Sequence, residues 1–165
     1  MFSDSENKAP KGPDHPVRIA GAEDAAVIGR LLHDFNTESH EPTPGPDALA
    51  DRVRELLAGD DFIVLLAGGE PRGLAVLRFR PSIWTEGLEC YLAELYVQPE
   101  HRRRGLGLAL MIATVDLARA QGADYIEVAT SEDDVAARAL YERFGFINRE
   151  LGPEGPVMFM YEREL

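Results

Sequence analysis

Residues 97–107 read Val97-Gln98-Pro99-Glu100-His101-Arg102-Arg103-Arg104-Gly105-Leu106-Gly107 and lie between a predicted strand and a predicted helix. Pro99 ends the strand because proline has no N–H for a ladder hydrogen bond. The two glycines let the backbone approach a ligand closely, and the helix N-terminus offers free N–H groups and the positive end of its dipole. The arginines add positive charge. This segment is therefore predicted to bind an anion such as phosphate.

A run of arginines followed by glycines also occurs in loops of a different kind. A solvated loop that balances nearby carboxylates would accommodate three arginines. A dinucleotide-binding fingerprint needs a third glycine where Leu110 stands, and the seven intervening residues 98–104 make the loop too long. A P-loop is excluded because the chain contains no Gly-Lys-Ser or Gly-Lys-Thr. The favoured interpretation is therefore a phosphate site that is neither a dinucleotide-binding fingerprint nor a P-loop.

The chain on either side alternates between helical and extended patterns. Helices are predicted for residues 22–35, 46–57 and 135–144, and a further one opens at Gly105-Leu106-Gly107 and ends near Gly122. Strands are predicted for residues 17–20, 62–67, 74–80, 88–97, 125–130, 146–149 and 157–163. The predicted order is therefore β-α-α-β-β-β-α-β-α-β-β. Such an order favours an α/β (α+β) fold, with helices packed on the faces of a mixed sheet.

Composition and charge limit the classes of function. The 165 residues include 17 Lys+Arg and 29 Asp+Glu, so the formal net charge is −12, which argues against a nucleic-acid or membrane binder. Residues 1–16 hold almost no apolar side chains and are predicted to be a flexible tail, followed by a single domain over residues 17–165. Cys90 is the only cysteine. We therefore expect a cytoplasmic protein with no internal disulfide.

Two motifs resemble those of the GCN5-related N-acetyltransferase (GNAT) family. Residues 102–107 match the family's R/Q-x-x-G-x-G/A pyrophosphate loop, and the Leu-Tyr-Val-Gln-Pro-Glu of residues 95–100 matches the strand and turn before it. Residues 139–146, Ala-Leu-Tyr-Glu-Arg-Phe-Gly-Phe, resemble the family's A-x-x-L-Y-x-x-x-G-F ending. The element order agrees as well. The resemblance implies a mixed, mostly antiparallel central sheet of about seven strands flanked by about four helices.

The resemblance also implies a reaction and a set of cofactor contacts. An acetyl group would pass directly from acetyl-CoA, as co-substrate, to an amine in a ternary complex, with no metal. The backbone of Leu95, Tyr96 and Val97 would pair with the pantetheine arm. The implied loop contacts are Arg102, Arg103, Arg104, Gly105, Leu106, Gly107 and Leu108. Asp134 stands where the family often has Asn, and we include it as a cofactor contact with that departure.

Tyr141 is the expected general acid. In the family, the tyrosine at this position points toward the CoA sulfur, and a phenol can protonate a departing thiolate while it is itself neutral beforehand. An isolated tyrosine at helical spacing beside Leu140 and Phe144 would more simply be a core aromatic. The surrounding motif favours the catalytic role.

Glu94 is the expected general base, because acidic residues at this place on the strand often serve so in the family. In a regular strand its side chain shares a face with Leu88, Cys90, Leu92 and Tyr96. Burial in that mostly apolar row would raise its pKa toward a useful range. Two alternatives are an ion pair with Arg78 or Arg80 on the neighbouring strand, and a β-bulge that turns the side chain to solvent.

The acceptor is predicted to be a cationic small-molecule amine. Residues 33–41 and 81–89, expected on the acceptor side, contain no Lys or Arg. Their carboxylates are Asp34, Glu38, Glu41, Glu86 and Glu89. An acidic rim of this kind would steer a cation, although acidity can also serve solubility alone. The alternatives are acetylation of a protein lysine or N-terminus and a non-catalytic CoA-binding module. Joining of terminal strands would allow a homodimer.

Overall fold

The computed structural model describes residues 15–165, in two compact units that are treated separately: residues 15–128 and residues 129–165. The tail predicted for residues 1–16 lies outside the described residues, apart from its last two positions. None of the helices within residues 15–165 combines the length and the apolar character that crossing a membrane requires.

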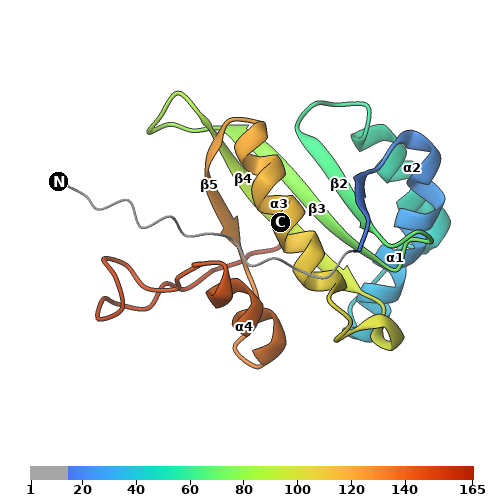
Figure 1. Cartoon of the computed structure of the whole chain (residues 1–165). Coiled ribbons are helices and arrows are strands. Elements are labelled where there is room, and N and C mark those ends of the chain that lie inside the picture. Colours follow the sequence, from blue (N-terminus) through green and yellow to red (C-terminus); the bar gives the residue numbers. More distant parts are fainter. Residues whose placement is uncertain (1–14) are drawn as a thin grey trace. The chain divides into compact units, whose positions relative to one another are not determined.

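The first unit is built on one open sheet of five strands (Figure 1). These are β1 (Val17–Ile19), β2 (Phe62–Ala67), β3 (Gly73–Pro81), β4 (Leu88–Val97) and β5 (Ala123–Val128), side by side in that order. The first four strands are antiparallel, and β5 joins β4 in parallel. The parallel pair requires a crossover, which residues 98–122 supply. That crossover contains the arginine-glycine segment and therefore places it at the end of β4.

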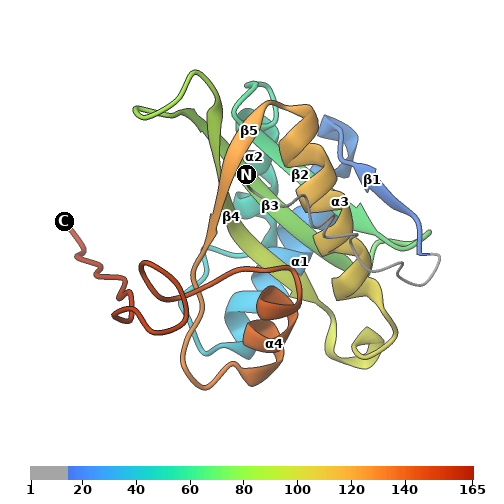
Figure 2. The ribbon, with the colours of Figure 1, turned by 60° about the vertical axis from the view of Figure 1, so that its left-hand side comes forward.

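Helices cover both faces of this sheet (Figure 2). The first face carries α1 (Ala25–Glu38) and α2 (Pro46–Leu56), and the other carries α3 (Leu106–Ala120). The central strands β2 and β3 are buried on both sides, which explains why they read as continuous apolar runs. One core joins α1 and α2 to β2 and β3 through residues such as Ile28, Leu31, Val53, Leu66 and Val76.

The helix α1 begins three residues later than its pattern predicts. Residues 22–24 form a 3₁₀ turn instead, because Asp24 bonds back to the preceding chain. Its carboxylate accepts from both terminal nitrogens of Arg18 at 2.7 Å and from the Gly21 N–H at 2.9 Å. The C-terminal end of α1 extends correspondingly further, to Glu38, and this brings a predicted acceptor-side carboxylate onto the helix.

The second unit contains α4 (Val135–Arg143) and an irregular C-terminal segment. The two strands predicted for residues 146–149 and 157–163 are not formed, and one isolated bridge between Arg149 and Val157 stands in their place. The prediction of seven strands is therefore not confirmed, because the described residues contain five. Phe159 and Tyr161 are largely exposed, so pairing would bury little apolar surface here. An isolated two-stranded hairpin is marginal in water without such burial.

Candidate functional site

The last five residues of β4 have a strand partner on one side only within the described chain. The ladder with β5 ends at the pair Leu92 and Val128, whereas the ladder with β3 continues to Val97. Residues 93–97 are thus at an open edge of the sheet, although β4 is a central strand over its first half. This splay leaves one edge of residues 93–97 without a strand partner within residues 15–165, and an extended ligand can add to such an edge.

A β-bulge lies at the start of that open segment. Val76 pairs with Glu94, but the next residue of β3, Leu77, pairs with Leu92, so Ala93 is an extra residue in β4. An extra residue reverses the alternation of side chains along a strand. The expectation that Glu94 shares a face with Leu88, Cys90 and Leu92 is therefore wrong. Lying opposite Val76, Glu94 shares instead the face of Tyr96, toward α1 and α2.

The carboxyl group of Glu94 is half-buried on this face. Burial raises its pKa above the usual range of a glutamate, and the positive charge of Arg78 partly opposes the shift. No ion pair joins Glu94 to Arg78 or Arg80 within residues 15–165, and Arg80 pairs instead with Glu89 at 2.7 Å and Glu127 at 3.0 Å. A carboxyl group whose pKa is raised by burial beside an open strand edge is a candidate for proton transfer.

The loop after β4 is shaped to expose amide groups. Arg103 and Gly105 both have positive φ, 60° and 89°, and Gly105 is the left-handed N-cap of α3. No side chain caps this helix. The N–H groups of Leu106, Gly107 and Leu108 belong to its first turn, so they have no partner within the helix. Together with the dipole they form a site suited to phosphate, beside the exposed Arg103 and Arg104.

Arg102 has several partners within the first unit. Its Nη1 and Nη2 donate to the two oxygens of Glu38 at 2.7 and 2.8 Å, and its Nε donates to the carbonyl of Val97 at 2.8 Å. The guanidinium carbon also lies 5.7 Å from the centre of the Tyr96 ring. Glu38 is accordingly not a free member of the acidic rim. Arg102 holds the pKa of Glu38 below its usual range through these hydrogen bonds.

Asp134 and Tyr141 belong to the second unit. Asp134 is the N-cap of α4, where its carboxylate accepts from the Ala137 N–H at 3.0 Å. Tyr141 is buried at 8% exposure, and its ring centre lies 5.9 Å from that of Phe146. The tyrosine therefore packs against the last residue of its motif, and the capping bond uses one oxygen of the Asp134 carboxylate.

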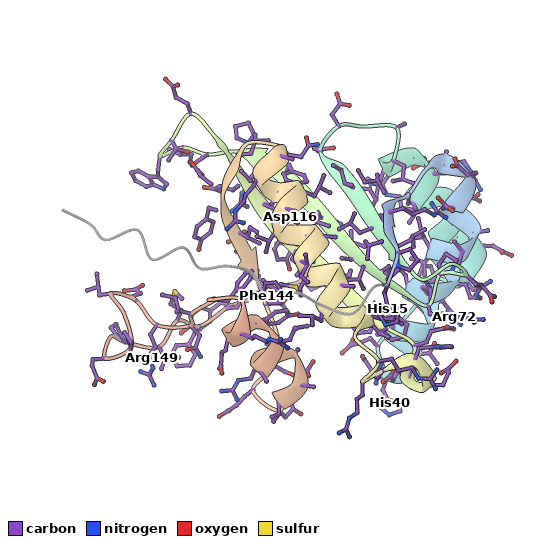
Figure 3. The ribbon with its side chains drawn as sticks, viewed as in Figure 1. His15, His40, Arg72, Asp116, Phe144 and Arg149 are labelled. Carbon is purple, nitrogen blue, oxygen red and sulfur yellow. The ribbon has the colours of Figure 1, made fainter. Side chains whose placement is uncertain are left out.

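Two contacts of the loop were not predicted from the sequence, because their partners are far apart along the chain. Arg102 contacts Glu38, which is 64 residues away. The carbonyl of Arg104 forms a hydrogen bond with the ring nitrogen Nε2 of His15, which is 89 residues away. His15 lies near the N-terminal end of α3 in Figure 3. Within residues 15–165, no group of three or more His, Cys, Asp or Glu side chains is arranged to hold a metal ion.

Comparison with known proteins finds a match that includes β4, the loop after it and both helices that follow. The sequence model of the acetyltransferase (GNAT) family matches residues 27–146, which include the open half of β4, the loop, α3 and α4. The chain belongs to the GNAT family. A crystal structure from Arthrobacter sp. FB24, provisionally described as an acetyltransferase, superposes on this GNAT chain with a TM-score of 0.84 and 47% identity. It covers 94% of this chain and 99% of its own.

Two curated relatives are also named as acetyltransferases. A mycothiol acetyltransferase of Beutenbergia cavernae is 38% identical over 134 residues, which is 79% of this chain and 44% of that protein. A thialysine N-epsilon-acetyltransferase of Caenorhabditis elegans is 32% identical over 87 residues, 53% of each chain. This GNAT chain thus spans about half the length of the curated relatives it matches.

Proposed function

We propose that this protein transfers an acetyl group from acetyl-CoA to a primary amine of a cationic small molecule. The observation that carries the proposal is the open end of β4 immediately before the uncapped N-terminus of α3. The strand edge suits an extended amide-containing arm, and the first turn of the helix suits a pyrophosphate. Acetyl-CoA combines these two chemical features in one molecule.

On the donor side, the loop residues divide into two groups. Gly105, Leu106, Gly107 and Leu108 would act through backbone amides; the two glycines leave space for a ligand, and the side chain of Leu106 is buried. Arg103 and Arg104 are exposed and make no side-chain hydrogen bond or ion pair within residues 15–165, so their charge is available to phosphates. Their contribution would weaken as salt is added, because exposed charges are screened.

The chemistry is a direct acyl transfer. A C–N bond forms to the amine and the C–S bond of the thioester breaks. Glu94, directly or through a water molecule, accepts the proton that the amine loses, and a backbone N–H of the open β4 segment stabilises the developing oxyanion. Cys90 is fully buried, and burial raises the pKa of its thiol to about 11, which is unsuitable for a covalent acyl intermediate.

A cationic acceptor is supported by the acidic residues that stay exposed. Glu41 and Glu86 are exposed and Asp34 is partly so, whereas Glu38 is bound by Arg102 and Glu89 by Arg80. The rim is therefore smaller than the sequence indicates, with three carboxylates in place of five. A relative named as acting on the ε-nitrogen of thialysine supports an amine on a small molecule.

The first test is a calorimetric titration with acetyl-CoA beside adenosine, which lacks the phosphates and the thioester arm. We expect micromolar binding of acetyl-CoA alone, followed by turnover of cationic amines in a panel that includes neutral and anionic ones. No binding at millimolar acetyl-CoA would refute the assignment of the loop. Preference for an anionic amine would refute the acceptor class while leaving the donor site intact.

Tyr141→Phe is expected to lower kcat by about tenfold with little change in acetyl-CoA affinity. The proposed role of Tyr141 rests on the motif of residues 139–146. The effect is modest for a general acid because a thiol has a pKa near 8.5 in model compounds, so the thiolate leaves without full protonation. Single-turnover kinetics with saturating acetyl-CoA would measure it. Phe144→Leu, at the C-cap of the same helix, is the matched control, and wild-type turnover by Tyr141→Phe would refute the acid assignment.

A further inference from the structure

Three of the five N–H donors of the Arg102 guanidinium make hydrogen bonds inside the first unit. Its Nε, Nη1 and Nη2 each donate a hydrogen bond of 2.7 to 2.8 Å, to Val97 or to Glu38. The contact with Glu38 is a parallel, bidentate pair, the strongest geometry available to an arginine and a carboxylate. These contacts serve a different role from the one that the loop motif assigns to this guanidinium, which is to add charge for phosphates.

The contacts of Arg102 connect three elements. Glu38 is the last residue of α1, Val97 is the last residue of β4, and Arg102 itself begins the loop after the 3₁₀ turn. Phe35 of α1 packs against Tyr96 of β4, with ring centres 5.2 Å apart and an angle of 31° between the rings. The end of the helix expected on the acceptor side is thereby attached to the strand and loop expected on the donor side.

This geometry points to Arg102 as a positioning residue, which holds the loop and the Val97 carbonyl in place through Glu38 instead of binding phosphate itself. The inference rests on the proposed function, because it assigns a cause to acetyl-CoA affinity. It has an unexpected consequence: Glu38, a negatively charged residue of α1, supports the binding of a negatively charged cofactor. A direct phosphate ligand would behave in the opposite way, since removal of Glu38 would release Arg102 toward the phosphates.

Glu38→Gln therefore distinguishes the two roles by the sign of its effect. We expect the Kd of acetyl-CoA to rise about fivefold, the scale of a well-oriented but partly exposed ion pair. Glu55→Gln is the matched control, because it removes an equal charge from an exposed ion pair with Arg52 on α2, outside the proposed site. We expect the Kd of that variant to equal the wild-type value. Tighter or unchanged binding by Glu38→Gln would overturn the inference.

Arg102→Lys supplies a second discriminating variant. Lysine serves well as a point charge for phosphate but cannot reproduce a bidentate fork that also reaches a carbonyl. We expect Arg102→Lys to weaken acetyl-CoA binding about as much as Arg102→Met, with kcat at saturating acetyl-CoA near wild type. The Glu38→Gln/Arg102→Met double variant should be no weaker than the worse single one. Near wild-type affinity of Arg102→Lys would identify a direct ligand, and additive losses would show that Glu38 and Arg102 act independently; either result would overturn the proposal.

Failure of this inference and failure of the proposed function give different results. Absence of acetyl-CoA binding by the wild-type protein would refute the function. Binding by the wild type, with variants that melt at lower temperature yet bind acetyl-CoA normally, would show a purely structural ion pair and refute the positioning role alone.

Discussion

Glu94→Gln is expected to lower kcat/KM by about 100- to 1,000-fold, the usual contribution of a general base. Glutamine keeps the size of the side chain but cannot accept the proton of the amine. Acetyl-CoA affinity should change little, because Glu94 faces α1 and α2 while the proposed cofactor contacts of β4 are backbone groups. Steady-state kinetics and calorimetry measure the two quantities separately.

The pH dependence gives this prediction a sharper form. A base must be deprotonated to act, so log kcat/KM should rise with pH through the pKa of Glu94, which burial places above the usual glutamate range. In Glu94→Gln that limb should disappear, while the limb due to the acceptor amine stays. Arg78→Gln should move the first limb to higher pH, because the charge of Arg78 lowers the pKa of Glu94.

A matched control separates the base from a general loss of charge. Glu127→Gln removes a carboxylate from the neighbouring strand β5, where it pairs with Arg80 on the surface. We expect less than about a twofold change in kcat/KM, because exposed ion pairs contribute little. Equal effects of the two substitutions, or a Glu94→Gln profile with its lower limb intact, would contradict the assignment of Glu94 as the base.

Gly107→Trp is expected to weaken acetyl-CoA binding by at least about 100-fold, or about 2.7 kcal/mol. Residue 107 is in the first turn of α3, where a large side chain would occupy the space in front of the exposed amides. Gly107→Ala is the graded control, since the loop pattern of the family admits alanine there. Titration of both variants with acetyl-CoA measures the difference.

The fold should survive this substitution. Tryptophan is a better helix former than glycine, and Gly107 has an ordinary helical conformation, unlike the left-handed Gly105. The melting temperature of Gly107→Trp should therefore stay close to that of the wild type, which would identify steric exclusion as the cause. Undiminished affinity in Gly107→Trp would show that the phosphates bind elsewhere.

Much of the architecture was accessible from local patterns. The bounds of β4 agree with the structure, and so does the sequence of elements as far as α4, because apolar periodicity, prolines and glycines report on neighbouring residues. The loop after β4 could also be located from the sequence, since its glycines and the helix start that follows are local features. The prediction of two C-terminal strands was wrong, because alternation of side chains alone does not supply a strand partner or a buried face. The exposed Phe159 and Tyr161 show this.

Local patterns were enough to locate the strand-loop-helix segment, to assign the family and to select residues for testing. The surroundings of Glu94 and Arg102 depend instead on tertiary contacts. The bulge at Ala93 depends on register between β3 and β4, which moves Glu94 to the other face of the sheet. The bond from Arg102 to Glu38 spans 64 residues and exists because α1 packs beside β4. Such contacts arise from packing of distant elements, and no local pattern encodes them.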